Sequence, residues 1–592
     1  MARTLRKPEN REVSLSAKDV ADILDEIGVM LEISGENPFK SRAYYSAARA
    51  LTSLDEGLDT LIEEHRLSSV PGIGTALTQK ITELVTTGKL AYYDRLKESI
   101  PRGLIEMLKI PGLGPKKINM LHKALSIETI GELEYACKEH RLQDLKGFGS
   151  KTQDKILQGI AQIRKYHERR LYAEVIEDAE AILSKVRNHA DVVNAEIAGS
   201  LRRCMETVKD IDILAATEHP HELSLFLASL PGIDHIIAQG DTKVSVALDS
   251  GINVDFRLVT PVEFPYALHH FTGSKEHNIA MRGRAKTKNL KMNEYGLFSG
   301  ETLLPCHSEE DIFEALGLSY IPPELREDRG EIEAAEIGTL PDLVDVSDIR
   351  GLLHLHTQAS DGADSIEALI HAARDMGIDY IGISDHSKSA AYAGGLSEDE
   401  IRAQHDEIDF LNKRYGKPYV LKGIESDILP DGRLDYDDAT LETFDFVIAA
   451  VHSHFRMTEE EMTLRIMHAM DNPATTILAH PTGRLLLARE PYRLSMEKIL
   501  SHAAERGTII ELNANPHRLD LDWRWCRHAK DLGVKITLNP DAHSIRGLSH
   551  IRFGVNIARK GWLTPADCIN CLGLAEIKKV LKNRDTSLFK TR

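Results

Sequence analysis

Long apolar runs and cysteines are both scarce in this sequence. No apolar run comes near the roughly 18 residues of a membrane-spanning helix, so no such helix is expected. The N-terminal stretch MARTLRKPENREVS has no apolar core behind its basic residues, so no secretory signal is expected. Six cysteines in 592 residues do not make a disulfide framework, which indicates the reducing cytoplasm. The lone CxxC pair, Cys568 and Cys571, is interpreted as ordinary helical sequence.

Positive charge is also in short supply. The chain carries 73 Lys and Arg against 91 Asp and Glu, a formal net charge of −18. This balance argues against nucleic acid, because phosphates are usually neutralised by a basic surface. The sum nevertheless counts carboxylates that bound cations would offset, and backbone N–H groups hold phosphates without formal charge. The net charge therefore weakens a nucleic-acid interpretation without excluding it.

A glycine motif is repeated three times in the first third of a chain that is long enough for several domains. VPGIGTALTQKI recurs as IPGLGPKKINML and LKGFGSKTQDKI. Each Gly-apolar-Gly turn permits close backbone approach, and the helix that follows offers free N–H groups to a phosphate. A plain helix–helix connection would need glycine too, but three copies favour binding of a nucleic-acid backbone. The predicted DNA-binding glycines are Gly72, Gly74, Gly112, Gly114, Gly147 and Gly149.

These repeats resemble the helix-hairpin-helix motif of DNA-repair proteins. The resemblance implies a monovalent cation held by hairpin carbonyl groups. Upstream, NPFKSRAYYSAARAL interleaves basic and aromatic residues at helical spacing. That pattern suits a 5′-phosphate or an unstacked base, and suits an amphipathic core helix equally well.

Three carboxylates in the middle of the chain form a candidate two-metal site. DIDIL is predicted to be a strand that points Asp210 and Asp212 to one face, and GINVDFRLVT supplies Asp255 on a second strand. Such carboxylates repel one another unless cations lie between them. Two Mg²⁺ ions held there would stabilise an in-line phosphoryl transfer. The turn from Gly199 to Arg203 before the first strand offers a hydroxyl and a guanidinium for terminal phosphates.

With HHFTGSKEHNIAMRGRAKTKNLKMNEYGLF following, this part resembles family X DNA polymerases of the nucleotidyltransferase superfamily. The resemblance implies that Asp210 and Asp212 hold both metals and that Asp255 helps to deprotonate the primer 3′-hydroxyl. His270 stands where the family often has Tyr, and Lys209 where it usually has Gly. The implied nucleotide-binding residues are Ser200, Arg203, Lys209, Phe271, Thr272, Gly273, Asn278 and Arg282.

Lys80 lies where relatives with 5′-deoxyribose phosphate lyase activity have a Schiff-base lysine. A lysine attacks an aldehyde only when its pKa is lowered. A solvated helix lysine is the alternative.

The last 240 residues alternate strands with helices, which predicts a βα barrel whose function lies at the C-terminal strand ends. Strands are predicted at LLHLH, YIGISDH, YVLKGIES, DFVIAAVHSH, TTILAH, TIIELNA and VKITLNPDAH, and helices at SIEALIHAARDM and EEMTLRIMHAM. Nearly every strand ends in a metal-type ligand, and buried groups of this kind are costly unless they are paired or metallated. Nine ligands can hold two or three ions, and the His and carboxylate mixture suits Zn²⁺, Mn²⁺ or Fe²⁺. The predicted ligands are His354, His356, Asp361, His386, Glu425, His452, His480, Asp541 and His543.

HLHTQASDG, ISDHS, GIESDI, AHPTGR and NPDAHS resemble the motifs of the PHP (polymerase and histidinol phosphatase) domain. The resemblance implies phosphate-ester hydrolysis by a metal-activated hydroxide. Arg484 is a candidate for the substrate phosphate, and Glu511 and Asn513 are candidates to support the ligands or the fold. Leu352 replaces the Asp that bacterial relatives usually have.

The fold class predicted is multidomain, α+β and α/β, with a helical helix-hairpin-helix region, a nucleotidyltransferase palm and thumb, and a distorted (βα)7 PHP barrel. The predicted segments are an 8-kDa-like helix-hairpin-helix domain at 1–88, fingers at 89–168, palm at 169–260, thumb at 261–325, a charged linker at 326–348 and the PHP domain at 349–592.

We expect a monomeric, cytoplasmic, gap-filling DNA polymerase that also has 3′–5′ exonuclease or 3′-end phosphoesterase activity. Its substrates would be gapped or primer-template DNA and deoxynucleoside triphosphates, with Mg²⁺ or Mn²⁺ in the palm. The alternatives are a phosphatase of small phosphomonoesters with a DNA-binding front half, and a non-enzymatic repair scaffold.

Overall fold

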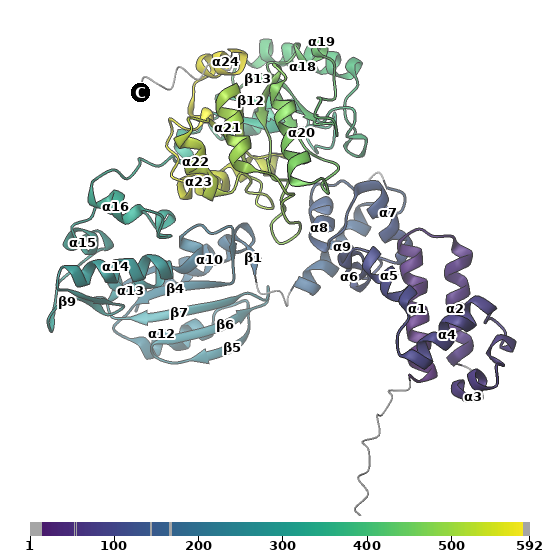
Figure 1. Ribbon diagram of the computed structural model, residues 1–592. Helices are drawn as coiled ribbons and strands as arrows, with labels where there is room; N and C mark the ends of the chain where they lie inside the picture. Colours follow the sequence, from purple (N-terminus) through teal and green to yellow (C-terminus); the bar gives the residue numbers. More distant parts are fainter. Residues whose placement is uncertain (1–14, 53, 55, 143–144, 165–168, 584–592) are drawn as a thin grey trace, which may run out of the picture. The chain divides into compact units, whose positions relative to one another are not determined.

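The computed structural model describes residues 15–52, 54, 56–142, 145–164 and 169–583 (Figure 1). Residues 1–137 and 142–163 make one compact unit, and residues 138–141 and 164–592 make a second. Residues 1–14, the N-terminal stretch considered above, lie outside the described residues. No helix in the described part of the chain is long and apolar enough to cross a membrane. The six cysteines are free thiols, and Cys571 ends a short 3₁₀ turn, not an α-helix.

The first unit is helical. Apolar side chains at helical spacing build two cores, one around α1, α2 and α4 and one around α7, α8 and α9. Its helices are α1 (Ala17–Ile33), α2 (Pro38–Thr52), α3 (Leu58–Glu63), α4 (Thr75–Thr87), α5 (Ala91–Ser99), α6 (Arg102–Glu106), α7 (Pro115–Leu125), α8 (Ile130–Lys138) and α9 (Ser150–Arg164).

The second unit begins with a five-stranded sheet in the order β2-β4-β7-β6-β5, in which only β4 and β7 are parallel. Its strands are β2 (Asn194–Ile197), β4 (Asp210–Ala216), β5 (Ile233–Gln239), β6 (Lys243–Leu248) and β7 (Asn253–Val259), and β1 (Arg170–Leu171) pairs with β3 (Thr207–Val208) beside it. The helices of this region are α10 (Tyr172–Arg187), α11 (Gly199–Arg202), α12 (Pro220–Ala228) and α13 (Phe264–Thr272).

The alternation along β4 decides which face of this sheet carries the chemistry. Ile211, Ile213 and Ala215 pack into the same core as α10 and α12, whereas Leu214 and Ala216 pack with α13. Because strand side chains alternate with a period of two, Asp210 and Asp212 share the α13 face. Gly199 to Arg203, expected as a turn, is mostly the single helical turn α11.

A thumb region follows and continues into a folded connector. It contains α14 (Lys275–Thr287), α15 (Glu309–Ala315) and the sheet β10-β9-β8 of Thr302–Leu303, Gly296–Ser299 and Lys291–Asn293. The segment expected as a charged linker instead contains α16 (Glu331–Glu336) and is held by buried charges. Arg326 bonds Glu309 at 2.5 Å, and Glu331 bonds Nδ1 of His277 at 2.7 Å. Paired charges of this kind fix a segment, so the connector belongs to the folded body.

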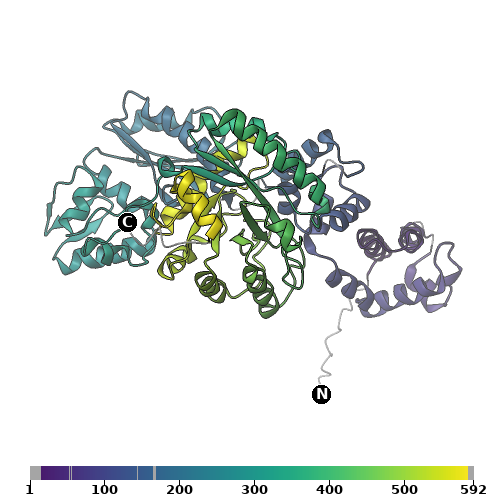
Figure 2. The ribbon, with the colours of Figure 1, turned by 90° about the horizontal axis from the view of Figure 1, so that it is seen from above.

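The rest of the described chain, up to residue 583, is the predicted barrel of seven parallel strands in sequential order. Green and yellow helices lie around the strands in Figure 2. A parallel bridge between Leu355 and Ala542 joins the first strand to the chain that follows the last. The strands are β11 (Gly351–Leu355), β12 (Tyr380–Ile383), β13 (Tyr419–Asp427), β14 (Phe446–Ala450), β15 (Thr475–Leu478), β16 (Ile509–Asn513) and β17 (Ile536–Asn539). The helices are α17 (Ile366–Asp375), α18 (Glu398–Tyr415), α19 (Asp438–Leu441), α20 (Glu459–Asp471), α21 (Met496–Arg506), α22 (Trp523–Asp531), α23 (Ile551–Lys560) and α24 (Leu574–Asn583).

Candidate active sites and nucleic-acid interface

The three palm carboxylates lie on adjacent strands, as the sequence predicted. Asp212 on β4 stands directly opposite Asp255 on β7. Burial, then the charges of Asp210 and Asp255, raise the pKa of Asp212 to about 7. Burial, then Asp255, also raises the pKa of Asp210. Burial and mutual repulsion disfavour the charged form of these carboxylates. Divalent cations bound between them would offset that repulsion.

Asp255 is held by two neighbours on β6. Lys243 Nζ lies 2.7 Å from one carboxylate oxygen, and Ser245 Oγ donates a 2.6 Å hydrogen bond to the other. Among the described residues, the groups of three or more ligand atoms within 4.8 Å of one another all belong to the barrel. The palm triad therefore does not converge as tightly, and Lys243 supplies a positive charge beside it.

Gly199 makes room for Asp212. Its φ is +63°, and a Cβ at this position would meet Asp212 Oδ2 at 2.0 Å. Glycine is thus required both for the left-handed backbone and for the close approach of the carboxylate.

The predicted triphosphate residues surround the start of β4. Ser200 lies on α11, and exposed Lys209 directly precedes Asp210. Arg203 donates through Nη1 to Thr272 O at 2.5 Å and through Nε to Glu327 at 3.0 Å. The structure thus brings Arg203 together with the FTG segment of the thumb.

The predicted sugar and base residues lie at the end of α13 and on α14. Thr272 Oγ1 accepts a 2.7 Å hydrogen bond from Arg202, and Asn278 donates to His270 O at 2.7 Å. Phe271 lies beneath the guanidinium of Arg257, 5.0 Å from the ring centre, and Arg282 on α14 is half-buried. Gly273 takes φ +71°, and a Cβ there would lie 3.0 Å from Arg203 Nη1.

The barrel rim brings its predicted ligands together in three overlapping groups. Eight of the nine predicted residues belong to these groups. The ninth, His480, reaches Glu425 Oε1 at 3.0 Å through Nε2. The groups are His356, Asp361, His386 and His543; His354, His356 and Asp541; and His386, Glu425 and His452.

The donor chemistry of this rim fits divalent metal ions. Buried atoms of His354 (Nε2), His356 (both ring nitrogens), Asp361 (Oδ2) and His480 (Nδ1) make no well-formed hydrogen bond to other described residues. Unpaired buried polar atoms are costly, and their convergence with carboxylates points to ions as their partners.

Electrostatics and backbone strain agree with that interpretation. Burial, then His543 and His386, lower the pKa of His356 to about 3, which keeps its imidazole neutral and able to bind metal. Burial alone would raise the pKa of Glu425, but His452, His354 and His386 lower it well below its usual range. His354, His480 and Asp541 adopt positive φ values of 61°, 26° and 49°. Strained non-glycine backbone of this kind clusters at functional sites.

Further residues orient the ligands. Glu511 accepts from His354 Nδ1 at 2.6 Å and from the His480 amide at 2.8 Å, and Asn513 bonds Asp541 at 3.0 Å. From the sequence, Glu511 and Asn513 were equally compatible with support of the ligands and support of the fold. Two orienting residues were not predicted: Asp427, which bonds His452 Nδ1 at 2.6 Å, and Asp385, which accepts from the Thr357 amide and so fixes that loop. The sequence signal for both was their position next to predicted ligands: Asp385 directly precedes His386, and Asp427 follows Glu425 by two residues.

Arg484 is not available for a substrate phosphate, so that expectation is wrong. Its guanidinium is buried and bonds Asp522 at 2.7 Å, Glu206 of the palm at 2.8 Å and the Arg518 carbonyl at 3.0 Å. The guanidinium beside the ligands is instead that of Arg518, whose Nε lies 3.4 Å from Asp541 Oδ2. Arg518 was not among the predicted site residues.

The three hairpins have the predicted shape. Gly72, Gly112 and Gly147, the first glycines, take φ values of 97°, 87° and 93°. The second glycines precede α4, α7 and α9, and a Cβ on any of them would meet nothing within 4 Å. Packing therefore does not require glycine at these positions. At Gly74 (φ −82°) and Gly114 (φ −94°) the backbone conformation does not require it either. A position without a side chain suits a ligand that approaches the backbone closely.

Lys80 lies in an aromatic pocket of the first unit. Its Nζ donates to the Tyr44 hydroxyl and stands 3.5 Å from the ring centre of Tyr92, which stacks on Tyr44. Burial, then the charge of Lys40, lower the pKa of Lys80. The sequence could not reveal this environment, because the aromatic rings come from other helices.

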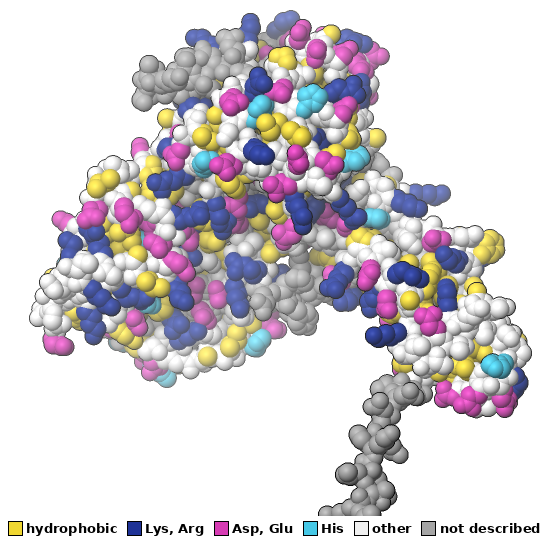
Figure 3. Space-filling view, in the orientation of Figure 1, with side chains coloured by type: hydrophobic (Ala, Val, Ile, Leu, Met, Phe, Trp, Pro, Cys, Tyr) yellow, Lys and Arg dark blue, Asp and Glu magenta, His cyan; other side chains and the backbone are white. Residues whose placement is uncertain are grey.

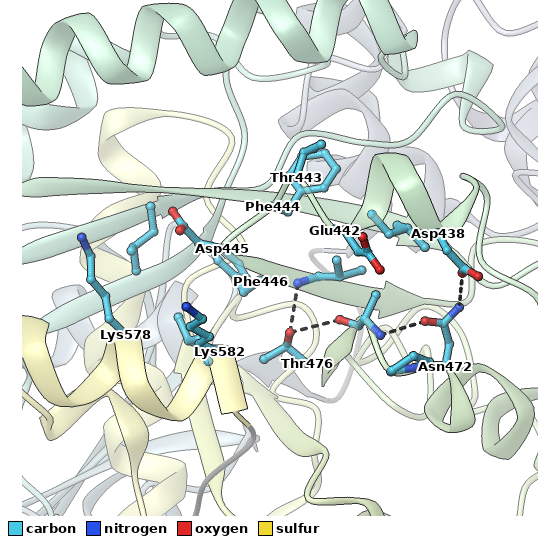
Figure 4. Close-up of a pocket in the computed structure, with 16 residues that line it drawn as sticks. Asp438, Glu442, Thr443, Phe444, Asp445, Phe446, Asn472, Thr476, Lys578 and Lys582 are labelled. Carbon is cyan, nitrogen blue, oxygen red and sulfur yellow. Dashed lines mark hydrogen bonds between the residues drawn. The ribbon is translucent and has the colours of Figure 1, made fainter.

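A separate cavity of 640 Å³ opens beside the first residues of β14 and β15, next to α24 (Figure 4). Its lining combines Asp438, Glu442 and Asp445 with Lys578 and Lys582 of α24. None of the three candidate metal groups lies there.

Comparison with known proteins agrees with this arrangement. Residues 16–90 match a helix-hairpin-helix domain family, 104–162 a SAM-like helix-hairpin-helix tandem, 267–327 the DNA polymerase beta thumb and 353–515 the PHP domain.

Three curated relatives cover different shares of the chain. The "DNA polymerase/3′-5′ exonuclease PolX" of Bacillus subtilis (strain 168) is 40% identical over 572 residues, 96% of this chain and 100% of that protein. The DNA polymerase lambda of Rattus norvegicus is 25% identical over 54% of this chain and 58% of its own length. Repair DNA polymerase X of African swine fever virus (isolate Tick/Malawi/Lil 20-1/1983) is 30% identical over 29% of this chain and 98% of its own.

The parallel barrel, the helical hairpins and the thumb confirm the predicted fold class, and the full-length similarity confirms the predicted family. The chain belongs to the family X DNA polymerases that carry a C-terminal PHP domain.

Proposed function

We propose that the protein is a DNA-directed DNA polymerase that fills short gaps in repair and also removes 3′ ends as a 3′–5′ exonuclease or phosphoesterase. The observation that carries the proposal is the presence, in one folded unit, of a strand-paired carboxylate triad and a separate histidine-rich rim. The first suits phosphoryl transfer and the second suits phosphate-ester hydrolysis.

In the polymerase site, Asp210 and Asp212 would hold the metals and Asp255 would take the proton of the primer 3′-hydroxyl. Mg²⁺ or Mn²⁺ would supply charge stabilisation for the in-line displacement. Ser200, Arg203 and Lys209 would bind the triphosphate. Asp255 needs its lone pairs free for this work, so Lys243 would have to release it when substrates arrive.

The thumb residues would recognise the rest of the nucleotide. Phe271, Thr272 and Gly273 would line the sugar, Asn278 would contact the base edge, and Arg282 the template. His270 is half-buried beside this segment, and its smaller ring in place of Tyr bears on sugar selectivity.

In the PHP site, nine rim residues would hold two or three ions of Mn²⁺, Zn²⁺ or Fe²⁺, which supply an activated hydroxide. Glu511 and Asp427 would keep His354 and His452 in the orientation that points the other ring nitrogen at the site. Arg518 would place positive charge near the scissile phosphate.

The hairpins would bind the DNA backbone through the helix N-termini, with a monovalent cation at hairpin carbonyl groups. This interface needs little formal charge, which reconciles DNA as a partner with a net charge of −18. Lys and Arg also gather in local groups among acidic side chains on the face seen in Figure 3. We propose that the protein acts as a monomer.

A third activity is supported by the environment of Lys80. Burial and the neighbouring Lys40 favour its neutral amine, the form that attacks the aldehyde of a 5′-deoxyribose phosphate.

Two variants test the division of labour. Wild-type, Asp210→Ala and His354→Ala proteins are given gapped DNA with nucleotides, and separately a 3′-labelled duplex without them. We expect Asp210→Ala to lose extension alone and His354→Ala to lose degradation alone. Equally poor extension by wild type and Asp210→Ala would refute the polymerase assignment.

A further inference from the structure

A lysine of the PHP domain is fully buried against the polymerase half of the same unit. Lys560, the last residue of α23, has a side chain that is 0% exposed. Its ammonium donates to Arg203 O at 3.1 Å, to Glu324 O at 3.3 Å and to Glu327 Oε1 at 2.5 Å. An ammonium has three protons, and all three are used. This is a built site for one positive charge, and its three acceptors come from the palm (Arg203), the end of the thumb (Glu324) and the connector (Glu327).

Glu327 links this ammonium to Arg203. The same oxygen, Oε1, accepts from Lys560 Nζ at 2.5 Å and from Arg203 Nε at 3.0 Å. Arg203 Nη1 is bound to Thr272 O. Among the described residues the side-chain hydrogen bonds of Arg203 use Nε and Nη1, which leaves Nη2 for an anionic ligand.

The charge of this cluster depends on the PHP lysine. Arg203, Glu327 and Lys560 together carry one net positive charge, whereas Arg203 and Glu327 alone would be a neutral pair. Arg203 and Glu327 are each only 14% exposed, so water screens this difference weakly. A neutral pair attracts a triphosphate less than a cluster with a net positive charge does.

We propose that Lys560 is a positioning residue of the polymerase site, through which the PHP domain sets the strength of nucleotide binding. The charge of Lys560 offsets that of Glu327, so the positive charge of Arg203 is not cancelled where the triphosphate would bind. Lys560 also holds the Arg203 carbonyl group in place. This inference rests on the proposed role of Arg203 as a triphosphate ligand.

A purely structural role predicts a different outcome. Removing one partner of a buried ion pair destabilises a protein, so Lys560→Met alone would lower stability under either interpretation. Replacing both charges with neutral groups restores the net charge of the cluster without restoring the ion pair. The double variant Lys560→Met/Glu327→Gln therefore separates charge compensation from packing.

The experiment measures single-nucleotide insertion on gapped DNA by the full chain, with kcat and KM for the nucleotide determined separately. The variants are Lys560→Met, Glu327→Gln, the double variant and Arg203→Ala. Lys530→Met is the matched control, because Lys530 bonds Trp562 O and Asp567 within the barrel. Melting temperature and exonuclease activity report folding of each protein.

We expect Lys560→Met to raise KM for the nucleotide about tenfold with a smaller change in kcat, while exonuclease activity is retained. The double variant should return KM most of the way, and Lys530→Met should leave it unchanged. If Arg203→Ala raises KM and Lys560→Met does not, the inference fails while the proposed role of Arg203 survives. If Arg203→Ala leaves KM unchanged, that role fails first. If Lys560→Met does not fold, the double variant Lys560→Met/Glu327→Gln decides. A KM of the double variant as high as that of Arg203→Ala would overturn the inference.

Discussion

Replacement of Gly199 by Ala tests whether the palm carboxylates are the centre of polymerisation. The added methyl group would occupy the place of Asp212 Oδ2, which lies 2.0 Å from the position of a Cβ. The backbone at φ +63° also disfavours alanine by about 1 kcal/mol. That strain is small against the ~5–15 kcal/mol stability of a folded domain, so the variant should fold.

Gly199→Ala is expected to lower the rate of nucleotide insertion far more than it lowers the stability of the fold. A displacement of about 1 Å in a reacting group costs about 100-fold in rate, and the alanine must move Asp212 by at least that much to avoid the clash. We therefore expect kcat for nucleotide insertion to fall about 100-fold or more, with exonuclease activity and melting temperature little changed.

Gly300 provides the matched control. Its φ is +62°, and a Cβ there would meet nothing within 4 Å. Gly300→Ala carries the same backbone strain without the clash, so it should extend DNA like wild type. If Gly199→Ala extends DNA as fast as Gly300→Ala does, the carboxylate arrangement described here is not the one that works in the enzyme.

Three further outcomes follow from the other sites. His354→Ala should lower the metal content of the protein, measured by elemental analysis, and abolish 3′ degradation while extension continues; full metal content would contradict the ligand assignment. Glu511→Gln weakens the hydrogen bond to His354 Nδ1, so metal affinity or exonuclease rate should fall about 10–100-fold. A metal-binding titration and an exonuclease rate like those of wild type would show that Glu511 only supports the fold. Lys40→Met removes one of the two causes that lower the pKa of Lys80, so that pKa should rise. Borohydride trapping of Lys80 on a 5′-deoxyribose phosphate should then need a higher pH, and an unshifted profile would rule out Lys40 as the cause.

Residue spacing was enough to predict the parts whose chemistry repeats with the period of an element. Asp210 and Asp212 share a face because strands alternate, and the barrel ligands share a rim because parallel strands all end on one side. The three glycine turns were visible because the same short motif occurs three times along the chain. These features depend on local geometry, which the sequence carries directly.

Contacts between distant segments could not be predicted in this way. Arg484 follows a ligand motif as a phosphate-binding residue would, yet it bonds Glu206, which precedes it by 278 residues. The connector after residue 325 is rich in charge like a solvated linker, but Arg326 and Glu331 are buried against partners in the thumb. Charge in a sequence shows that a partner is needed without indicating which segment supplies it.

The Arg484–Glu206 ion pair bears on where this protein can be truncated. Glu206 lies three residues after Arg203 and is only 10% exposed, and its guanidinium partner belongs to the loop that follows His480. A fragment that stops before the barrel would expose this carboxylate, without its counter-charge, beside the proposed nucleotide pocket. The polymerase half is therefore not an interchangeable module, and activity measured on such a truncation would describe an altered enzyme.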